Sequence, residues 1–260
     1  MLPKQFLPTY IKNSHLVRVG SIYDGGYVLP KILLKNTNLL ISLGIGDNWE
    51  FEKYFSKCSK CKIVAYDHSI DNKYWFNKFR ISIINFFSLK YFKLQKLYKI
   101  IQFIDFYFFF KINKKNKFYL KKIGKKKGCI SFKEIMNSNS KKKIFLKCDI
   151  EGTEYFFFKE IINYHDKING FIFEFHHVTK NLNKILNFIK KINKYYFLVH
   201  IHANNFSSVS KKNIPNTLEL TFAHKKFFKF KRKKNNKKYP IEGLDNPNFK
   251  RAKDINLYFN

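Results

Sequence analysis

A short apolar run that ends in acids constrains this chain most. Residues 144–148 read as a buried strand, and the acids Asp149, Glu151 and Glu154 follow it directly. Buried carboxylates are costly unless they are paired, and open parallel α/β sheets bind ligands beyond the carboxyl ends of their strands. The pattern predicts a ligand site at this strand end. The alternative is a plain strand, turn and helix, in which the acids favour the helix dipole.

An earlier segment has the same strand-then-site arrangement. Residues 38–43 predict a strand, Gly44 and Gly46 form a turn after it, and a helix follows. A second predicted strand, at 62–66, ends in Asp67, 21 residues beyond Gly46, which is near the spacing at which an acid meets ribose hydroxyls. The third glycine of a dinucleotide fingerprint would fall at Trp49. We therefore expect an adenosine-bearing ligand other than NAD or FAD.

The remaining segments complete an alternating pattern. Ser131 and Glu134 have capping-box spacing, and residues 182–192 have the apolar period of an amphipathic helix. Further strands are predicted at 117–123, 144–148, 170–175, 196–202 and 217–223. No helix separates the last two, which predicts an antiparallel hairpin at the sheet edge. The fold class is therefore α/β: a doubly wound, Rossmann-like, seven-stranded sheet, mostly parallel, with a final antiparallel hairpin strand.

The chain divides into three parts. Residues 1–37 form an N-terminal segment that contributes to the site, 38–223 form the main domain, and 224–260 form a basic loop and tail. A basic, aromatic insert at about 71–116 reads as helical, with apolar residues at Phe92, Leu97, Ile100, Ile101, Ile104 and Phe108. Core packing is the preferred role for the insert. A cap over the site, a dimer contact and contact with a membrane surface remain open.

The tail also carries two expectations. The lysine-rich stretch 224–239 reads as a solvated loop, and the turn-rich stretch 239–247 is expected to fold back over the site.

The net charge of +33 suggests an anionic partner. The cations are nearly all lysines, however, and arginine is the residue that reads phosphates and bases in a bidentate manner. Lys, Asn, Ile, Phe and Tyr are abundant together, as an AT-rich coding sequence would produce. No separate nucleic-acid-binding module is visible either, so nucleic acid is not a predicted partner.

Cysteine usage and hydropathy point to the cytoplasm. Cys58 and Cys61 form a CxxC without a second pair at zinc-site spacing, which favours ordinary reduced cysteines. The first ten residues lack the apolar core of a signal peptide. The most apolar window, 97–110, is too short to span a bilayer and contains Lys99 and Asp105. We predict a cytoplasmic protein without a transmembrane segment, with peripheral membrane contact left open.

These strings resemble the FkbM-type family of S-adenosylmethionine-dependent methyltransferases over about residues 18–223. Residues 146–154 carry the most specific string, Lys-x-Asp-Ile-Glu-Gly-x-Glu, and the insert is longer than the family pattern. The other matches are Asp24-Gly-Gly-Tyr-Val-Leu29, Ser42-Leu-Gly-Ile-Gly-Asp47, Ala65-Tyr-Asp-His68 and Phe173-Glu-Phe-His176, with a weaker one at Leu244-Asp-Asn-Pro247. The resemblance implies a class I methyltransferase that uses S-adenosylmethionine. Its acceptor would be a hydroxyl of a sugar, a glycan or another small molecule.

The resemblance also implies roles for individual residues. Gly44 and Gly46 would lie under the methionine part of the cofactor, Asp67 would hold the ribose hydroxyls, and His68 would flank the adenosine. Asp149 would sit where cofactor and acceptor meet. The predicted cofactor-binding residues are Gly25, Gly26, Gly44, Gly46, Asp47, Asp67, His68 and Asp149.

Methyl transfer to a hydroxyl depends on alignment and on removal of a proton. The predicted catalytic residues stand at strand ends: His176, Asp149, Glu151 and Glu174. His176 is the first choice for the general base because an imidazole titrates near neutral pH. The alternative is a structural histidine that is hydrogen-bonded to a loop.

A second polar cluster consists of His200, His202 and Asn204. Alternation places the two histidines on one face of a strand. With Asp149 and Glu174 they form a candidate site for a divalent cation, although we do not predict a bound metal. Two other function classes stay open: an RNA or protein methyltransferase, and a non-catalytic glycan- or membrane-associated relative. The sequence leaves the acceptor, the methylated atom and the oligomeric state undetermined.

Overall fold

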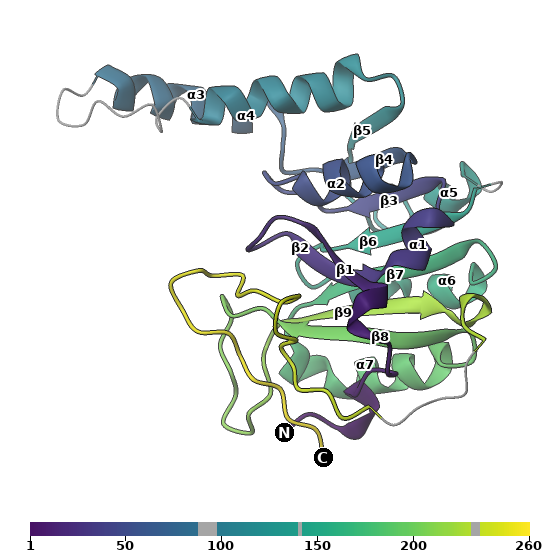
Figure 1. Ribbon diagram of the computed structural model, residues 1–260. Helices are drawn as coiled ribbons and strands as arrows, with labels where there is room; N and C mark the ends of the chain where they lie inside the picture. Colours follow the sequence, from purple (N-terminus) through teal and green to yellow (C-terminus); the bar gives the residue numbers. More distant parts are fainter. Residues whose placement is uncertain (88–97, 140–141, 230–234) are drawn as a thin grey trace.

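The computed structural model describes residues 1–87, 98–139, 142–229 and 235–260, and Figure 1 shows their arrangement. Its main sheet consists of β3 (Leu39–Leu43), β4 (Lys62–Asp67), β5 (Asn116–Leu120), β6 (Ile144–Cys148), β7 (Ile168–Phe175), β8 (Tyr196–Ala203) and β9 (Leu218–His224). The spatial order is β5-β4-β3-β6-β7-β9-β8. Neighbours from β5 to β7 are parallel, and β9 runs antiparallel to β7 and β8. The predicted fold class is confirmed.

The central strands are apolar because both faces of the sheet are covered. On one face lie α1 (Lys31–Lys35), α2 (Glu50–Ser59) and the hairpin of β1 (Leu16–Gly20) and β2 (Gly26–Pro30). There Phe55 of α2 packs on Phe145 of β6. On the other face, Phe158 of α6 (Phe158–Asn163) stacks on Phe188 of α7 (Val178–Ile192). The predicted capping box begins α5 (Phe132–Asn137).

The order in which the chain adds strands to the sheet reverses between β3 and β6. The chain proceeds from β3 through β4 to β5 toward one edge, and then resumes at β6 on the other side of β3. The carboxyl ends of these two strands lie side by side, because Leu43 pairs with Cys148. Such a switch point is where open α/β sheets bind ligands. The glycine turn that follows β3 and the acids that follow β6 both lie at this point.

The insert forms an arm of two helices that lie alongside each other beyond β4 and β5 (Figure 1). They are α3 (Asn72–Phe87) and α4 (Tyr98–Tyr107), which continues into the π-helix η4 (Phe108–Ile112). Trp75 packs against Phe106, and both side chains are buried. The helical prediction is confirmed here, although Phe92 and Leu97 lie outside the described residues.

The prediction that the insert packs in the core is wrong for part of it. Ile101, Ile104 and Phe108 are 61%, 48% and 58% exposed. The apolar period is real, but these side chains lie on the outer face of α4, while Phe106 on its inner face is buried. Hydrophobic spacing identifies an apolar stripe without identifying what covers it.

The tail returns across the domain. Asn235 is buried and its amide donates to the Pro8 carbonyl and to the Tyr239 hydroxyl, so the solvated loop predicted for 224–239 is wrong at this end. Asn248 donates to Asp24 at 3.1 Å, next to the site. Within the described ranges, no helix is both long enough and apolar enough to cross a membrane.

Candidate functional site

The glycine turn after β3 is shaped by the neighbouring strand end. Gly44 has φ of +75°, and a Cβ at this position would lie 1.7 Å from the Asp149 carbonyl oxygen. Only glycine permits this close approach. Gly46 has φ of +53°, and a Cβ there would meet no atom within 4 Å. The turn therefore packs tightly against β6 at Gly44 and opens onto free space at Gly46.

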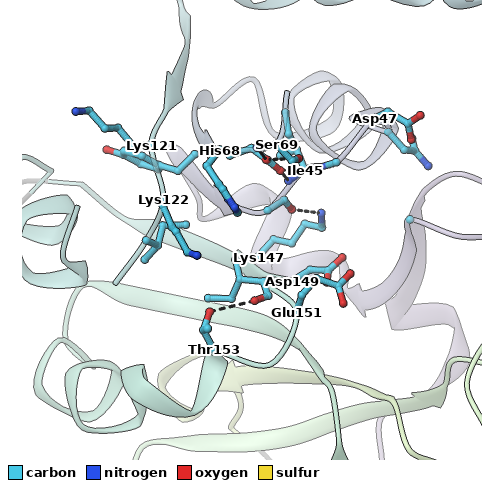
Figure 2. Close-up of a pocket in the computed structure, with 18 of the residues that line it drawn as sticks. Ile45, Asp47, His68, Ser69, Lys121, Lys122, Lys147, Asp149, Glu151 and Thr153 are labelled. Carbon is cyan, nitrogen blue, oxygen red and sulfur yellow. Dashed lines mark hydrogen bonds between the residues drawn. The ribbon is translucent and has the colours of Figure 1, made fainter. Parts of the chain in front are cut away.

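That space is a cavity of about 530 Å³, which we call the main cavity (Figure 2). Its size is within the usual range for small-molecule sites. The walls come from the β1–β2 turn, the glycine turn, the ends of β4 and β6, and the segment after β5. Of the predicted cofactor-binding residues, all but Gly26 line it: Gly25, Gly44, Gly46, Asp47, Asp67, His68 and Asp149. Gly26 lies in β2, where a Cβ would lie 2.0 Å from the Ser21 carbonyl oxygen.

Asp67 fastens the glycine turn to β4. Its Oδ2 accepts from the backbone amides of Ile45 and Gly46, both at 2.9 Å. Its Oδ1 accepts from the Ser69 amide at 2.7 Å and the Ser69 hydroxyl at 2.6 Å. Burial would raise the pKa of Asp67, but these hydrogen bonds outweigh it and lower the pKa. The carboxylate expected to meet a ribose is thus also the anchor of the turn.

The side chain of Asp47 contacts the arm. Its Oδ2 accepts from Lys99 Nζ at 2.8 Å and from the Tyr74 hydroxyl at 3.0 Å. These hydrogen bonds lower the pKa of Asp47 against the opposing effect of burial. In Figure 2 the Asp47 side chain lies at the rim, away from the other labelled residues. The Asp47 carboxylate therefore ties the glycine turn to the arm.

A buried ion pair under the turn was missed in the sequence. Lys147 is 3% exposed, and its Nζ donates to the Gly44 carbonyl at 3.0 Å and lies 3.6 Å from Glu52 Oε1. Burial opposes the charge on Lys147, but Glu52 and Asp149 outweigh it and raise the pKa. The available signal was a lysine inside an otherwise apolar strand, since such a cation needs a buried partner.

A second hollow, of about 300 Å³, adjoins the main cavity. We call it the acidic hollow; it shares Asp24, Asp149 and Glu151 with the main cavity and also includes Glu174, His176, Asn204 and Thr217. Four of the 18 acids in a chain of net charge +33 therefore converge on one small hollow. An ionised carboxylate can accept hydrogen bonds but cannot donate them. The hollow is suited to groups that donate hydrogen bonds.

Glu174 is held at the back of this hollow. Its Oε1 accepts from Asn204 Nδ2 at 2.9 Å, and its Oε2 accepts from the Tyr27 hydroxyl at 3.3 Å. Burial first, and the nearby charges of Asp149 and Glu219 second, raise the pKa of Glu174 well above its usual range. Tyr27, a further contact that the sequence did not reveal, links the N-terminal hairpin to the site.

His176 stands among the acids in a fixed orientation. Its Nδ1 lies 2.8 Å from Oε1 of the fully buried Glu154. Its Nε2 lies 3.4 Å from Glu151 and 3.8 Å from Asp149. Burial would lower the pKa of His176, but the Glu154 hydrogen bond and the surrounding carboxylate charges raise it. The pKa of His176 is therefore raised above its ordinary value.

Asp149 lies on the border between the two cavities. Its carboxylate makes no hydrogen bond to any residue in the described part of the chain. Burial raises the pKa of Asp149 to about 6, with Lys147 and His176 acting in the opposite direction. Glu151 follows with φ of +53° and a side chain that is 86% exposed. The structure thus brings together all four predicted catalytic residues.

The candidate cation site around the β8 histidines does not form in the described residues. His200 Nε2 lies 3.1 Å from Asp245, and His202 lies 3.2 Å from Glu219 and 3.0 Å from Asp254. Two of these partners lie in the tail. The hydrogen bonds and ion pairs of the two histidines therefore go to residues other than Asp149. Only Asn204 of that cluster reaches the site.

A different group has ligand atoms within 4.8 Å of one another: Asp149, Glu151 and His176. This spacing would suit a cation, but contact between the His176 imidazole and the two acids accounts for it equally well.

Comparison with known proteins yields no family profile and no curated protein that matches the sequence. Among solved structures, an rRNA methylase from Streptococcus thermophilus is 10% identical, with TM-score 0.41, over 75% of this chain and 90% of that one. A precorrin-6y C5,15-methyltransferase from Geobacter metallireducens is 11% identical, with TM-score 0.38, over 75% and 83%. A Streptococcus mutans protein in complex with SAH is 12% identical, with TM-score 0.36, over 74% and 94%. Matches this distant carry no information about activity.

Proposed function

We propose that this chain is an S-adenosylmethionine-dependent methyltransferase of the FkbM type, which methylates a hydroxyl of a sugar, a glycan or another small molecule. One observation carries the proposal. At the switch point of the sheet, a glycine turn opens onto a cavity of about 530 Å³, and Asp149 joins that cavity to an acidic hollow. A donor and an acceptor could thus meet at a single carboxylate.

The residues present fit the cofactor. The methionine part would lie over Gly44 and Gly46, where a side chain at residue 46 would project into open space. The ribose and adenine would lie toward Asp67 and His68 at the end of β4. When bound, S-adenosylmethionine supplies a methyl group on a sulfonium that is already a good leaving group. What remains for the chain is to align the acceptor and remove its proton.

The acidic hollow supports a hydroxyl-bearing acceptor. Its carboxylates and the Asn204 side chain would hold hydroxyl groups, and its negative charge disfavours phosphates. For that reason RNA is the weaker alternative, in spite of the net charge of +33. The open side chain of Glu151 and the anchored Glu174 would both orient the acceptor.

For the general base, the geometry favours Asp149 over His176. A base must be free of its proton, and the carboxylates around His176 raise its pKa. Asp149, with a pKa of about 6, is ionised at neutral pH and has no hydrogen bond to a described residue. We propose that Asp149 accepts the hydroxyl proton. His176, oriented by Glu154, would keep the acidic hollow ordered.

Calorimetric titration with S-adenosylmethionine tests the cofactor. We expect micromolar binding by the wild type, at least about tenfold weaker binding by Asp67→Ala because charged hydrogen bonds are lost, and unchanged binding by Asp166→Ala. Asp166 is an exposed acid outside both cavities. A well-folded wild type that does not bind the cofactor would overturn the proposal.

Transfer of a labelled methyl group tests the acceptor. Simple sugars, sugar nucleotides and glycans would be offered alongside total RNA and a protein lysate. Incorporation into the sugar fractions supports the proposal. Incorporation into RNA or protein alone would replace it with the corresponding alternative.

A further inference from the structure

The arm has an outer face that the rest of the described chain leaves exposed. Of the 22 exposed large apolar residues in the described chain, ten belong to α3, α4 and η4. Of the six on α4 and η4, five recur every three or four positions and so share one helical face. They are Tyr98, Ile101, Ile104, Phe108 and Ile112, each 48–61% exposed. Isolated exposed apolar residues are ordinary, but a continuous stripe of them indicates a binding surface.

The opposite face of α4 is fastened to the domain. Gln102 donates to the Asp47 carbonyl, and Lys99 donates to Asp47 Oδ2 at 2.8 Å. Phe106 on the same side is buried against Trp49 and Trp75. These three contacts come from one side of the helix. At the edge of the stripe, Asp105 accepts from Trp49 Nε1 at 2.8 Å and from Lys53 Nζ at 2.7 Å. They hold the arm with its apolar stripe turned away from the domain.

The charged residues of the arm indicate what kind of surface the apolar stripe would bind. In residues 72–84 and 98–115, Asp105 is the sole acid, and it is paired with Lys53. The same residues carry exposed or half-buried cations at Lys73, Lys78, Arg80, Lys111, Lys114 and Lys115. The outer surface of the arm is therefore apolar and cationic, without an unpaired acid. This composition complements a surface of anionic lipids, into which apolar side chains can insert while lysines and arginines meet the headgroups.

We propose that the arm binds peripherally to an anionic lipid bilayer, with the outer face of α4 and η4 in the interfacial region. A second copy of the chain fits less well, because two such arms would bring like charges together. RNA also fits less well, because isoleucine side chains make no contribution to phosphate contacts. The inference concerns a surface remote from the acidic hollow and holds whether or not the chain is a methyltransferase.

Vesicle flotation with the full chain tests the proposal. The probes are vesicles of phosphatidylcholine alone and vesicles of equal parts phosphatidylcholine and phosphatidylglycerol. We expect the chain to float with the anionic vesicles at low salt and to remain unbound with the neutral ones. Ile101→Asp should weaken the partitioning by at least about tenfold, since it replaces an inserting side chain with a charge that lipid repels.

Two controls make the test specific. Ile22→Asp changes an isoleucine that is 68% exposed but lies in the β1–β2 turn, and it should float like the wild type. The double variant Arg80→Glu, Lys111→Glu should lose binding to anionic vesicles while keeping the apolar stripe intact. Circular dichroism would verify that each variant folds.

Several outcomes would overturn the proposal. These are failure of the wild type to bind anionic vesicles, equal binding to neutral vesicles, or the same loss of binding in Ile22→Asp and Ile101→Asp. Sedimentation velocity would be run on the same samples. A dimer that Ile101→Asp dissociates, without vesicle binding, would assign the stripe to a second copy instead.

Discussion

The buried carboxylate of Glu154 lies 2.8 Å from Nδ1 of His176 and thereby turns Nε2 of the imidazole toward Asp149 and Glu151. Glu154 also accepts from the Gly152 amide at 3.0 Å, so one side chain orders both the acidic turn and the histidine. Neither residue needs to touch a ligand for this arrangement to form. Glu154 is therefore a positioning residue, and its effect should be visible in the ionisation of His176.

Replacing Glu154 by Gln removes a charge without changing the shape of the side chain. We expect the pKa of His176 to fall, because the hydrogen bond and charge of Glu154 are the main effects that raise it against burial. The measurement is an NMR titration of the imidazole in the wild type and in Glu154→Gln. Glu242→Gln, an exposed acid in the tail, serves as the control. An unchanged titration in Glu154→Gln would contradict the positioning role.

Replacing Asp67 by Asn tests whether the turn needs the carboxylate itself. A carboxamide has one oxygen, so its NH2 group would face either the turn amides or Ser69, all of which are donors. We expect a loss of roughly 1–3 kcal/mol in the free energy of unfolding, because buried donors lose their acceptor. Cofactor binding should weaken as well. Denaturant unfolding measures the first effect, and stability equal to the wild type would mean that Asp67 does not anchor the turn.

Much of this fold was visible in the sequence because the sheet is covered on both faces. A strand such as 144–148 must then be apolar at nearly every position, which is easy to recognise. The position of β9 between β7 and β8 was not predicted, because local pattern does not encode the pairing partner. The same limit explains His200 and His202, whose partners Asp245 and Asp254 lie 45 and 52 residues away. The site residues at strand ends were predictable, whereas Glu154 and Lys147 depend on contacts from other elements.

The Lys147–Glu52 pair should show strong energetic coupling. Both side chains are at most 4% exposed, so neither charge can be hydrated if its partner is removed. We expect Lys147→Met alone to cost about 3–5 kcal/mol in the free energy of unfolding, as is typical when a buried pair is broken. The double variant Lys147→Met, Glu52→Gln should be less destabilised than the sum of the single variants. Urea unfolding of the four proteins measures the coupling, and simple additivity would mean that the two charges act independently.

Removal of divalent cations should leave methyl transfer unchanged. Asp149, Glu151 and His176 lie close enough to share a cation, but the two carboxylates already have the His176 imidazole as a partner, at 3.8 Å and 3.4 Å from its Nε2. The test is the turnover of enzyme dialysed against EDTA, measured with and without added Mg²⁺ or Mn²⁺. A loss of turnover that either ion restores would show that a metal belongs in the acidic hollow.

The pH dependence of turnover should report the ionisation of Asp149. Burial raises the pKa of this carboxyl to about 6, and the general base must be ionised to accept a proton. Turnover at saturating cofactor should therefore rise as the pH increases through about 6 and then level off. Asp149→Asn should abolish that rise and lower turnover by roughly 10²–10⁴, the usual contribution of a general base. Cofactor affinity, measured in parallel by calorimetry, should change far less than turnover. If Asp149→Asn keeps the wild-type profile and His176→Gln loses it, the base is His176, and the raised pKa of the histidine then sets the position of the rise.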